Sequence, residues 1–254
     1  MKESGKPTAN WNPWHGCRKF SPGCRHCYMY RTDERYGRDP SLIAKTQDFS
    51  LPVKKDRAGN WKLPSGTLVW TCFTSDFLLE DADAWRQEAW AMMHMRPDLS
   101  FFFITKRIHR LIQCLPPDWG AGYKNVHIAC TVEDQERADC RLPLFQQAPV
   151  CQKTIVCSPL LEELDLTPYL GPWVEQVVAG GESGPEARIC KFDWIRSLRA
   201  QCEQAGVAFR FQQTGAFFFK EGKYYHIPRK FQHLQARRAN IDYRPDSPAA
   251  RRET

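Results

Sequence analysis

The sequence lacks the features of several protein classes. No apolar run approaches the roughly 18 uncharged residues of a membrane span, and the first residues hold no apolar stretch typical of a signal peptide. Internal repeats and low-complexity tracts are also missing. The eleven cysteines are an odd number that cannot pair completely, and cytosolic thiols stay reduced. We therefore expect a globular, cytoplasmic protein with reduced cysteines and no membrane partner.

The composition is that of one large globular fold. Hydrophobic residues make up 42% of the 254 residues, and nine Trp and fifteen Phe can fill a large core. The charged share of 26% argues against general disorder. A single α/β barrel takes about 200 to 250 residues, so the length fits one barrel with appendages.

Apolar, β-rich runs alternate with helical stretches along the chain. Their hydrophobicity is continuous, which is typical of strands buried on both faces, and the runs cover residues 68–73, 101–104, 126–130, 154–157, 174–179 and 207–211. Between them, residues 82–95 predict a helix, and Asp193 and Gly206 are placed to begin and end another. With a strand before Cys17, these units predict a parallel α/β fold, a partial (β/α)6-like TIM-type barrel; a doubly wound open sheet is the alternative.

Two segments differ from this repeating pattern. Residues 38–66 are rich in turn formers and predict an insertion with a short hairpin. We expect the barrel to span residues 1–215, with a cysteine loop at 11–28, and residues 216–254 to form an aromatic hairpin and a basic extension. Residues 229–254 hold seven Lys or Arg against three Asp or Glu, so they supply +4 of the net charge of +7.

Three cysteines form a C-x6-C-x2-C cluster in a loop with two prolines and two glycines: Cys17, Cys24 and Cys27. Such a loop can fold three thiolates round one centre. A cubane held by three cysteines leaves one iron open, and that iron can chelate the amino and carboxylate groups of S-adenosylmethionine. The alternative is structural zinc with His15 or His26 as the fourth ligand. Because the loop opens a β-α series, where barrel enzymes place their chemistry, we favour the cluster.

Polar residues follow the predicted strands, where the ends of barrel strands line a site. We expect cofactor contacts from Ser75, Asp76, Lys106, Glu133, Gly180, Gly181 and Glu182, and substrate contacts from Arg107, Ser183, Gln212 and Gln213. Each also has an ordinary structural role open to it. Asp76 can cap a helix, the glycines can form a turn, Lys106 and Arg107 can begin a solvated helix, and the glutamines can satisfy backbone groups.

A combination of motifs resembles a known family. The motifs are Trp11-Asn-Pro, Gly16-Cys17, Ser21-Pro-Gly-Cys24, Cys27-Tyr28, Ile104-Thr-Lys-Arg107, Thr131-Val-Glu133, Val178-Ala-Gly-Gly-Glu-Ser-Gly-Pro185 and Ala187-Arg188. Over residues 10–215 they are similar to a phage-associated family catalogued only as a domain of unknown function, which in turn resembles radical SAM enzymes. The resemblance implies a partial barrel, a [4Fe-4S] cluster and S-adenosylmethionine. Two features depart from that superfamily, whose usual spacing is C-x3-C-x2-C and whose glycine-glycine-glutamate motif follows the second strand.

The charge and the phage association point to the substrate. A basic C-terminal region beside aromatic residues predicts a nucleic-acid partner; a hairpin packed on the barrel with a frayed tail is the alternative. The resemblance favours hydrogen abstraction from a modified base in phage DNA, such as rearrangement of a side chain on a 5-substituted thymidine, in the host cytoplasm. An external flavodoxin or ferredoxin would supply electrons. The alternatives are a thymine-lesion lyase of the spore photoproduct type and a non-catalytic, zinc-stabilised nucleic-acid-binding protein.

Overall fold

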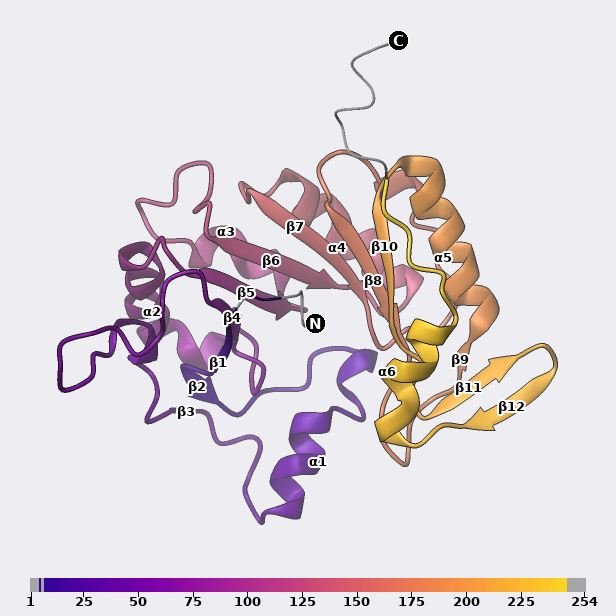
Figure 1. Ribbon diagram of the computed structural model, residues 1–254, viewed down its shortest axis with the longest axis horizontal. Coiled ribbons are helices and arrows are strands. Elements are labelled where there is room, and N and C mark those ends of the chain that lie inside the picture. Colours follow the sequence, from indigo (N-terminus) through magenta and orange to yellow (C-terminus); the bar gives the residue numbers. More distant parts are fainter. Residues whose placement is uncertain (1–4, 6, 246–254) are drawn as a thin grey trace, which may run out of the picture. The chain divides into compact units, whose positions relative to one another are not determined.

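The computed structural model describes residue 5 and residues 7–245 (Figure 1). Arg251 and Arg252 of the expected basic tail lie outside this part. The chain divides into two compact units, one of residues 1–131 and 147–153, the other of residues 132–146 and 154–254. We describe each unit by itself.

Parallel strands form the sheet of the first unit. The order is β1-β4-β5-β6, and their bounds are β1 Thr8–Trp11, β4 Leu68–Thr71, β5 Ser100–Thr105 and β6 Val126–Thr131. A small antiparallel pair joins β2 (Trp14–His15) to β3 (Ala44–Lys45). Consecutive parallel strands are therefore neighbours, with helices in the connections.

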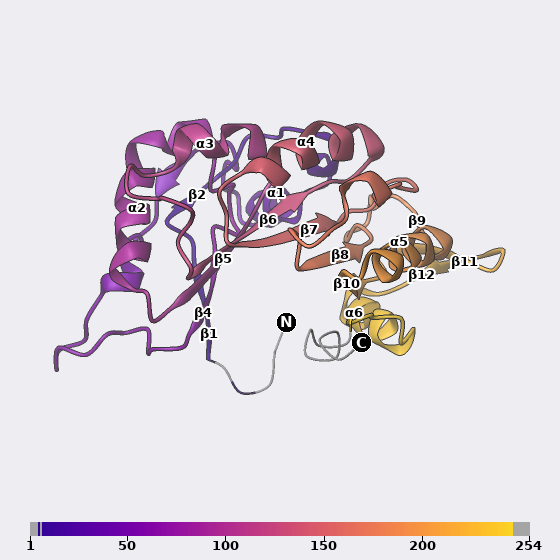
Figure 2. The same cartoon turned by 90° about the horizontal axis from the view of Figure 1, so that it is seen from above.

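The helices of the first unit follow its strands. They are α1 Tyr28–Arg35, α2 Asp83–Met95 and α3 Leu111–Cys114, with short 3-10 turns at Pro22–Cys24, Leu51–Val53, Glu80–Ala82 and Ile108–Arg110. Figure 2 shows α2 and α3 on the same side of β4 and β5. Trp90 of α2 packs edge-on against Phe77, whose ring stacks on Phe103 of β5 with 4.6 Å between centroids. Burial of each Phe contributes about 1.5 to 3 kcal/mol, so this aromatic layer holds α2 on the sheet.

The insertion of residues 38–66 contains the expected turn. Lys55 and Trp61 form an antiparallel bridge, and the Asp56 side chain accepts the backbone N–H groups of Ala58 and Asn60. Arg96, which is fully buried, donates to the carbonyls of Pro52 and Leu63 and so fixes the insertion to the end of α2.

The second unit has three parallel strands in the order β7-β8-β10. Its elements are α4 Gln135–Gln147, β7 Gln152–Cys157, the 3-10 turn Thr167–Tyr169, β8 Gln176–Gly180, β9 Cys190–Lys191, α5 Phe192–Ala205, β10 Ala208–Gln213, β11 Phe217–Lys220, β12 Lys223–His226 and α6 Arg229–Arg238. Helix α5 packs on β8 and β10 through Ile195, Leu198 and Cys202. Its N-cap is Lys191, two residues before the expected cap Asp193, and its C-cap is Gly206 with φ of 65°, as predicted.

The C-terminal segment is an integral part of the second unit. Strands β12, β11 and β9 form a small sheet, and α6 packs against β10 (Figure 1). Phe209 of β10 and Tyr243 exchange backbone hydrogen bonds of 2.8 and 2.9 Å, which ties the chain after α6 to the parallel strands.

The prediction of a parallel α/β fold is confirmed. Within the described residues, the strand order of each unit increases without the reversal that marks a doubly wound sheet, and the arrangement is compatible with a partial TIM-type fold. None of the helices in this part of the chain combines the length and the apolar character needed to cross a membrane.

Candidate functional site

The cysteine loop is folded tightly against the rest of the first unit. Gly16 has φ of 89°, and a Cβ there would lie 2.4 Å from the carbonyl oxygen of Leu42, so only glycine fits. The backbone N–H of Cys17 donates to Pro40, and the Tyr30 hydroxyl donates to the Cys17 carbonyl. Cys24 ends a 3-10 turn, and Cys27 directly precedes α1. The local sequence thus holds the three cysteines on one short, constrained segment.

The three thiols of this loop are half-buried and influence one another. Burial is the main cause that raises the pKa of Cys17 to about 12; Asp76 raises it further, Arg107 opposes this, and Cys24 and Cys27 add smaller increases.

Most of the other eight cysteines are buried. Six are buried, namely Cys72, Cys114, Cys130, Cys157, Cys190 and Cys202, whereas Cys140 and Cys151 are exposed. Most of them are thus small buried hydrophobic residues, and the three of the loop are set apart by their grouping.

Asp76, predicted from its place after β4, is buried and saturated with hydrogen bonds. It accepts from the backbone N–H of Leu78 at 2.9 Å, the Thr105 hydroxyl at 2.7 Å and the backbone N–H of Lys106 at 3.0 Å. These donors come from the loop after β4 and from the end of β5, so Asp76 joins the two strand ends. Its first role is to organise this edge of the sheet.

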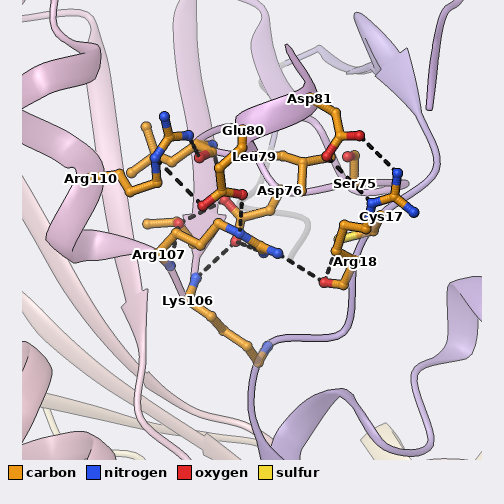
Figure 3. Close-up of polar contacts among 12 residues, drawn as sticks. Cys17, Arg18, Ser75, Asp76, Leu79, Glu80, Asp81, Lys106, Arg107 and Arg110 are labelled. Carbon is orange, nitrogen blue, oxygen red and sulfur yellow. Dashed lines mark hydrogen bonds and ion pairs between the residues drawn. The ribbon is translucent and has the colours of Figure 1, made fainter. Parts of the chain in front are cut away.

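Arg107 links the same strand ends to the cysteine loop (Figure 3). Its guanidinium donates to the carbonyl of Arg18 at 2.9 Å, contacts Glu80 at 3.2 Å and Asp76 at 3.5 Å, and lies 4.9 Å from the centre of the Phe20 ring. Only 3% of Arg107 is exposed. Since Arg18 directly follows Cys17, Arg107 fixes the backbone beside the first thiol.

Two more predicted residues lie in this network. The Ser75 hydroxyl donates to the carbonyl of Gly16, next to Cys17. Lys106 differs, because its side chain is half-buried, extends away from the carboxylates in Figure 3 and has no hydrogen bond or ion pair to another described residue. Its ammonium group remains available for an anionic ligand.

Two further ion pairs of this network were not predicted from the sequence. Arg18 pairs with Asp81 at 2.9 Å, and the buried Asp33 of α1 binds His15 at 2.7 Å. Met29 and Asp33 are four residues apart, so both lie on the buried face of α1. This spacing could have indicated that Asp33 is buried and needs a partner such as His15. This pair braces the segment before Cys17 against the helix after Cys27.

The predicted acidic residues of the second unit are held by arginines. Glu133, fully buried, accepts from Arg141 at 2.8 Å. Glu182 accepts from Nε and Nη2 of Arg188 at 3.0 and 2.7 Å, and also from its backbone N–H. Buried carboxylates require such partners, so both side chains have a structural role besides the expected ligand contact.

Gly180 and Gly181 are needed for close packing against the end of β10. A Cβ on Gly181 would lie 2.3 Å from the carbonyl oxygen of Thr214, and one on Gly180 would lie 3.1 Å from Gln213. Gln213 also donates to the Gly181 carbonyl at 2.8 Å. Close packing against Gln213 and Thr214 therefore explains why both positions are glycine.

The two other residues expected to contact substrate are accessible. Gln212 is exposed, with its carbonyl accepting from His233, and Ser183 is half-buried.

Comparison with protein families is informative over nearly the whole chain. A model of a family described as protein of unknown function (DUF5131) matches residues 7–243. The chain belongs to this family. The match includes the cysteine loop and extends past residue 215, so the hairpin and α6 are part of the family's common sequence. No curated protein and no solved structure matches the chain.

The residues of the cysteine loop can be compared with the ligands of a Cys3His zinc site and with those of a [4Fe-4S] cluster. Within the described residues, no group of three or more His, Cys, Asp or Glu side chains is arranged so that it could hold a metal ion, and His15 is engaged with Asp33. This does not fit a Cys3His zinc site built on His15. A cubane binds each thiolate through a different iron, so its ligands stand further apart than those of a single ion. Three thiols on one loop are compatible with that chemistry.

Proposed function

We propose that this protein is a radical S-adenosylmethionine enzyme whose [4Fe-4S] cluster is held by Cys17, Cys24 and Cys27. The observation that carries the proposal is the grouping of three half-buried thiols on a loop fixed to the ends of two parallel strands. Barrel enzymes place their chemistry at such strand ends. We further propose that the parallel strands belong to a partial (β/α)6 barrel.

The chain's own residues would bind and orient the reactants. When bound, the cluster supplies the electron that cleaves the C–S bond of S-adenosylmethionine and so starts hydrogen abstraction from a substrate. Ser75 and Arg107 hold the backbone of Gly16 and Arg18 on either side of Cys17, and Asp76 fixes the strand ends that carry them. Lys106, with its unengaged ammonium, is suited to an anionic group such as a carboxylate or a phosphate.

The proposed substrate is a modified base in nucleic acid, as in phage DNA with 5-substituted thymidines. The net charge of +7 supports a polyanionic partner. A base inside a duplex would have to leave the stack to reach a buried site. We propose a flavodoxin or a ferredoxin as the electron donor.

Anaerobic purification with metal analysis tests this function. We expect about four irons per chain after reconstitution, and 5′-deoxyadenosine from S-adenosylmethionine under a strong reductant. Cys17→Ala should lower the iron content and abolish cleavage. Cys140→Ala is the matched control, because Cys140 lies exposed on α4. This variant should change neither the iron content nor the cleavage of S-adenosylmethionine.

Two results would contradict the proposal. One is a single tightly bound zinc per chain with no cleavage of S-adenosylmethionine, which would favour a zinc-stabilised binding protein. The other is equal iron content in Cys17→Ala and Cys140→Ala. Substrate is tested separately, by comparing the nucleosides of phage DNA made with and without the gene.

A further inference from the structure

The β11–β12 hairpin of the second unit carries four aromatic rings on one face. In its antiparallel register Phe217 lies opposite His226 and Phe219 lies opposite Tyr224. The ring centroids of these pairs are 5.2 and 4.7 Å apart. Directly opposed residues point to the same side and side chains alternate along a strand, so all four rings share one face. We call Phe217, Phe219, Tyr224 and His226 the aromatic face.

The opposite face of the hairpin accounts for its attachment to the unit. There Phe218 lies opposite Tyr225, and the buried Phe218 ring is 6.0 Å from both Phe192 and Phe211. The aromatic face is turned away from this contact, and 73% of Tyr224 is exposed. Packing therefore explains Phe218. On the other face Tyr224 and His226 are exposed and Phe217 and Phe219 are half-buried, which marks an interaction surface.

Positive charge follows the aromatic face along the chain. Arg229 and Lys230 begin α6 shortly after β12, both are exposed, and neither has an ion pair to another residue that the structure describes. Lys220 and Lys223 also belong to the hairpin, but alternation turns them to the opposite face, where the Lys220 ammonium lies 5.0 Å from the centre of the Phe192 ring. Figure 1 shows the hairpin reaching out from the second unit, where an extended ligand can approach it.

Rings with cations beside them match the chemistry of single-stranded nucleic acid. Each base has a face that stacks on an aromatic side chain, and phosphates follow the bases at a spacing that lysine and arginine can reach. A duplex offers stacked bases whose faces are covered, so it fits this surface less well.

We propose that the aromatic face stacks the bases of a single-stranded nucleic acid and that Arg229 and Lys230 contact its phosphates. This deepens the proposed function and rests on it for the identity of the partner. The binding itself requires no cluster.

Fluorescence anisotropy with a labelled twelve-residue oligothymidylate tests the proposal on the full-length protein. Tyr224→Leu removes the most exposed ring, and Tyr225→Leu is the matched control on the opposite face. We expect Tyr224→Leu to raise Kd roughly 5- to 100-fold, the range for loss of one stacked base, and Tyr225→Leu to change Kd less than about twofold. Inorganic polyphosphate, which has no bases, should bind all three proteins alike.

A second variant separates charge from stacking. Arg229→Gln with Lys230→Gln should weaken binding of both probes and reduce the slope of log Kd against log salt concentration by about 0.7 for each of the two cations that contacts phosphate.

Three results would overturn the proposal. An unchanged Kd for the oligonucleotide in Tyr224→Leu would exclude stacking on this face. If Tyr224→Leu weakened the binding of the oligonucleotide and of polyphosphate equally, the surface would be a general site for polyanions. Self-association that Tyr224→Leu abolishes, without an effect on oligonucleotide binding, would assign the face to a second copy. Cys17→Ala should bind the oligonucleotide like the unchanged chain, so failures of the two proposals appear in different measurements.

Discussion

Replacing Arg107 tests how the cysteine loop is attached to the strand ends. In Arg107→Ala the carbonyl of Arg18 loses its donor, which costs about 1 to 2 kcal/mol if water does not replace it. Asp76 loses an ion pair at 3.5 Å but keeps three other donors, so this loss adds about 1 kcal/mol. Glu80 is half exposed and contributes little. With the cation–π contact of the guanidinium on the Phe20 ring, we expect a total loss of about 2 to 4 kcal/mol.

Urea unfolding followed by circular dichroism of the cluster-free protein measures this loss. Arg25→Ala is the control, because Arg25 is an exposed arginine of the same loop whose side chain has no ion pair to another described residue, and it should change stability by less than about 0.5 kcal/mol. Arg107→Met, which keeps the stem and removes the donors, should lie between the two. Limited trypsin digestion reports on the loop itself, where cleavage after Lys19 should accelerate in Arg107→Ala.

The reasoning is refuted if Arg107→Ala and Arg25→Ala unfold at the same urea concentration. It is also refuted if Arg107→Ala loses stability while cleavage after Lys19 stays slow, since the guanidinium would then stabilise another part of the unit.

Two further predictions concern stability. Gly181→Ala should cost more than about 2 kcal/mol, because its Cβ would collide with the Thr214 carbonyl at 2.3 Å, whereas Gly171→Ala, at ordinary contact distance, should cost less than about 1 kcal/mol in the same unfolding assay. The Arg96 guanidinium lowers the pKa of Asp98 to about 2, so this contact stabilises the fold above about pH 4 and is lost as the pH falls toward 2. Because Asp98 is one-third exposed, we expect at most about 2 kcal/mol, visible as a steeper acid loss of stability than in Asp98→Asn; equal slopes would contradict it.

Local sequence determined the elements of this fold. Apolar runs predicted the parallel strands, and the spacing of Ile195, Leu198 and Cys202 with Gly206 behind them predicted α5. These signals work because strand and helix periodicity and the left-handed glycine cap act over a few residues. The start of α5 was missed by two residues, since its N-cap is Lys191 and Asp193 lies in the first turn of the helix.

The sequence also grouped the candidate ligands but could not show how they are held. The spacing from Cys17 to Cys27 fits within a short loop, so it could be read directly. The contact from Arg107 to the carbonyl of Arg18 joins residues 89 positions apart, and it depends on the pairing of β1 with β4 and of β4 with β5. Strand order and register are tertiary properties, since they depend on which segments pair across the sheet.

The same distinction holds for the C-terminal hairpin. Its consecutive aromatic residues were visible in the sequence, and the alternation of side chains along a strand places Phe217 and Phe219 on one side and Phe218 on the other. Which side is buried was decided by tertiary packing, because Phe211 of β10 covers Phe218. Periodicity is encoded within a strand, whereas burial depends on the neighbours that the whole fold brings to each face.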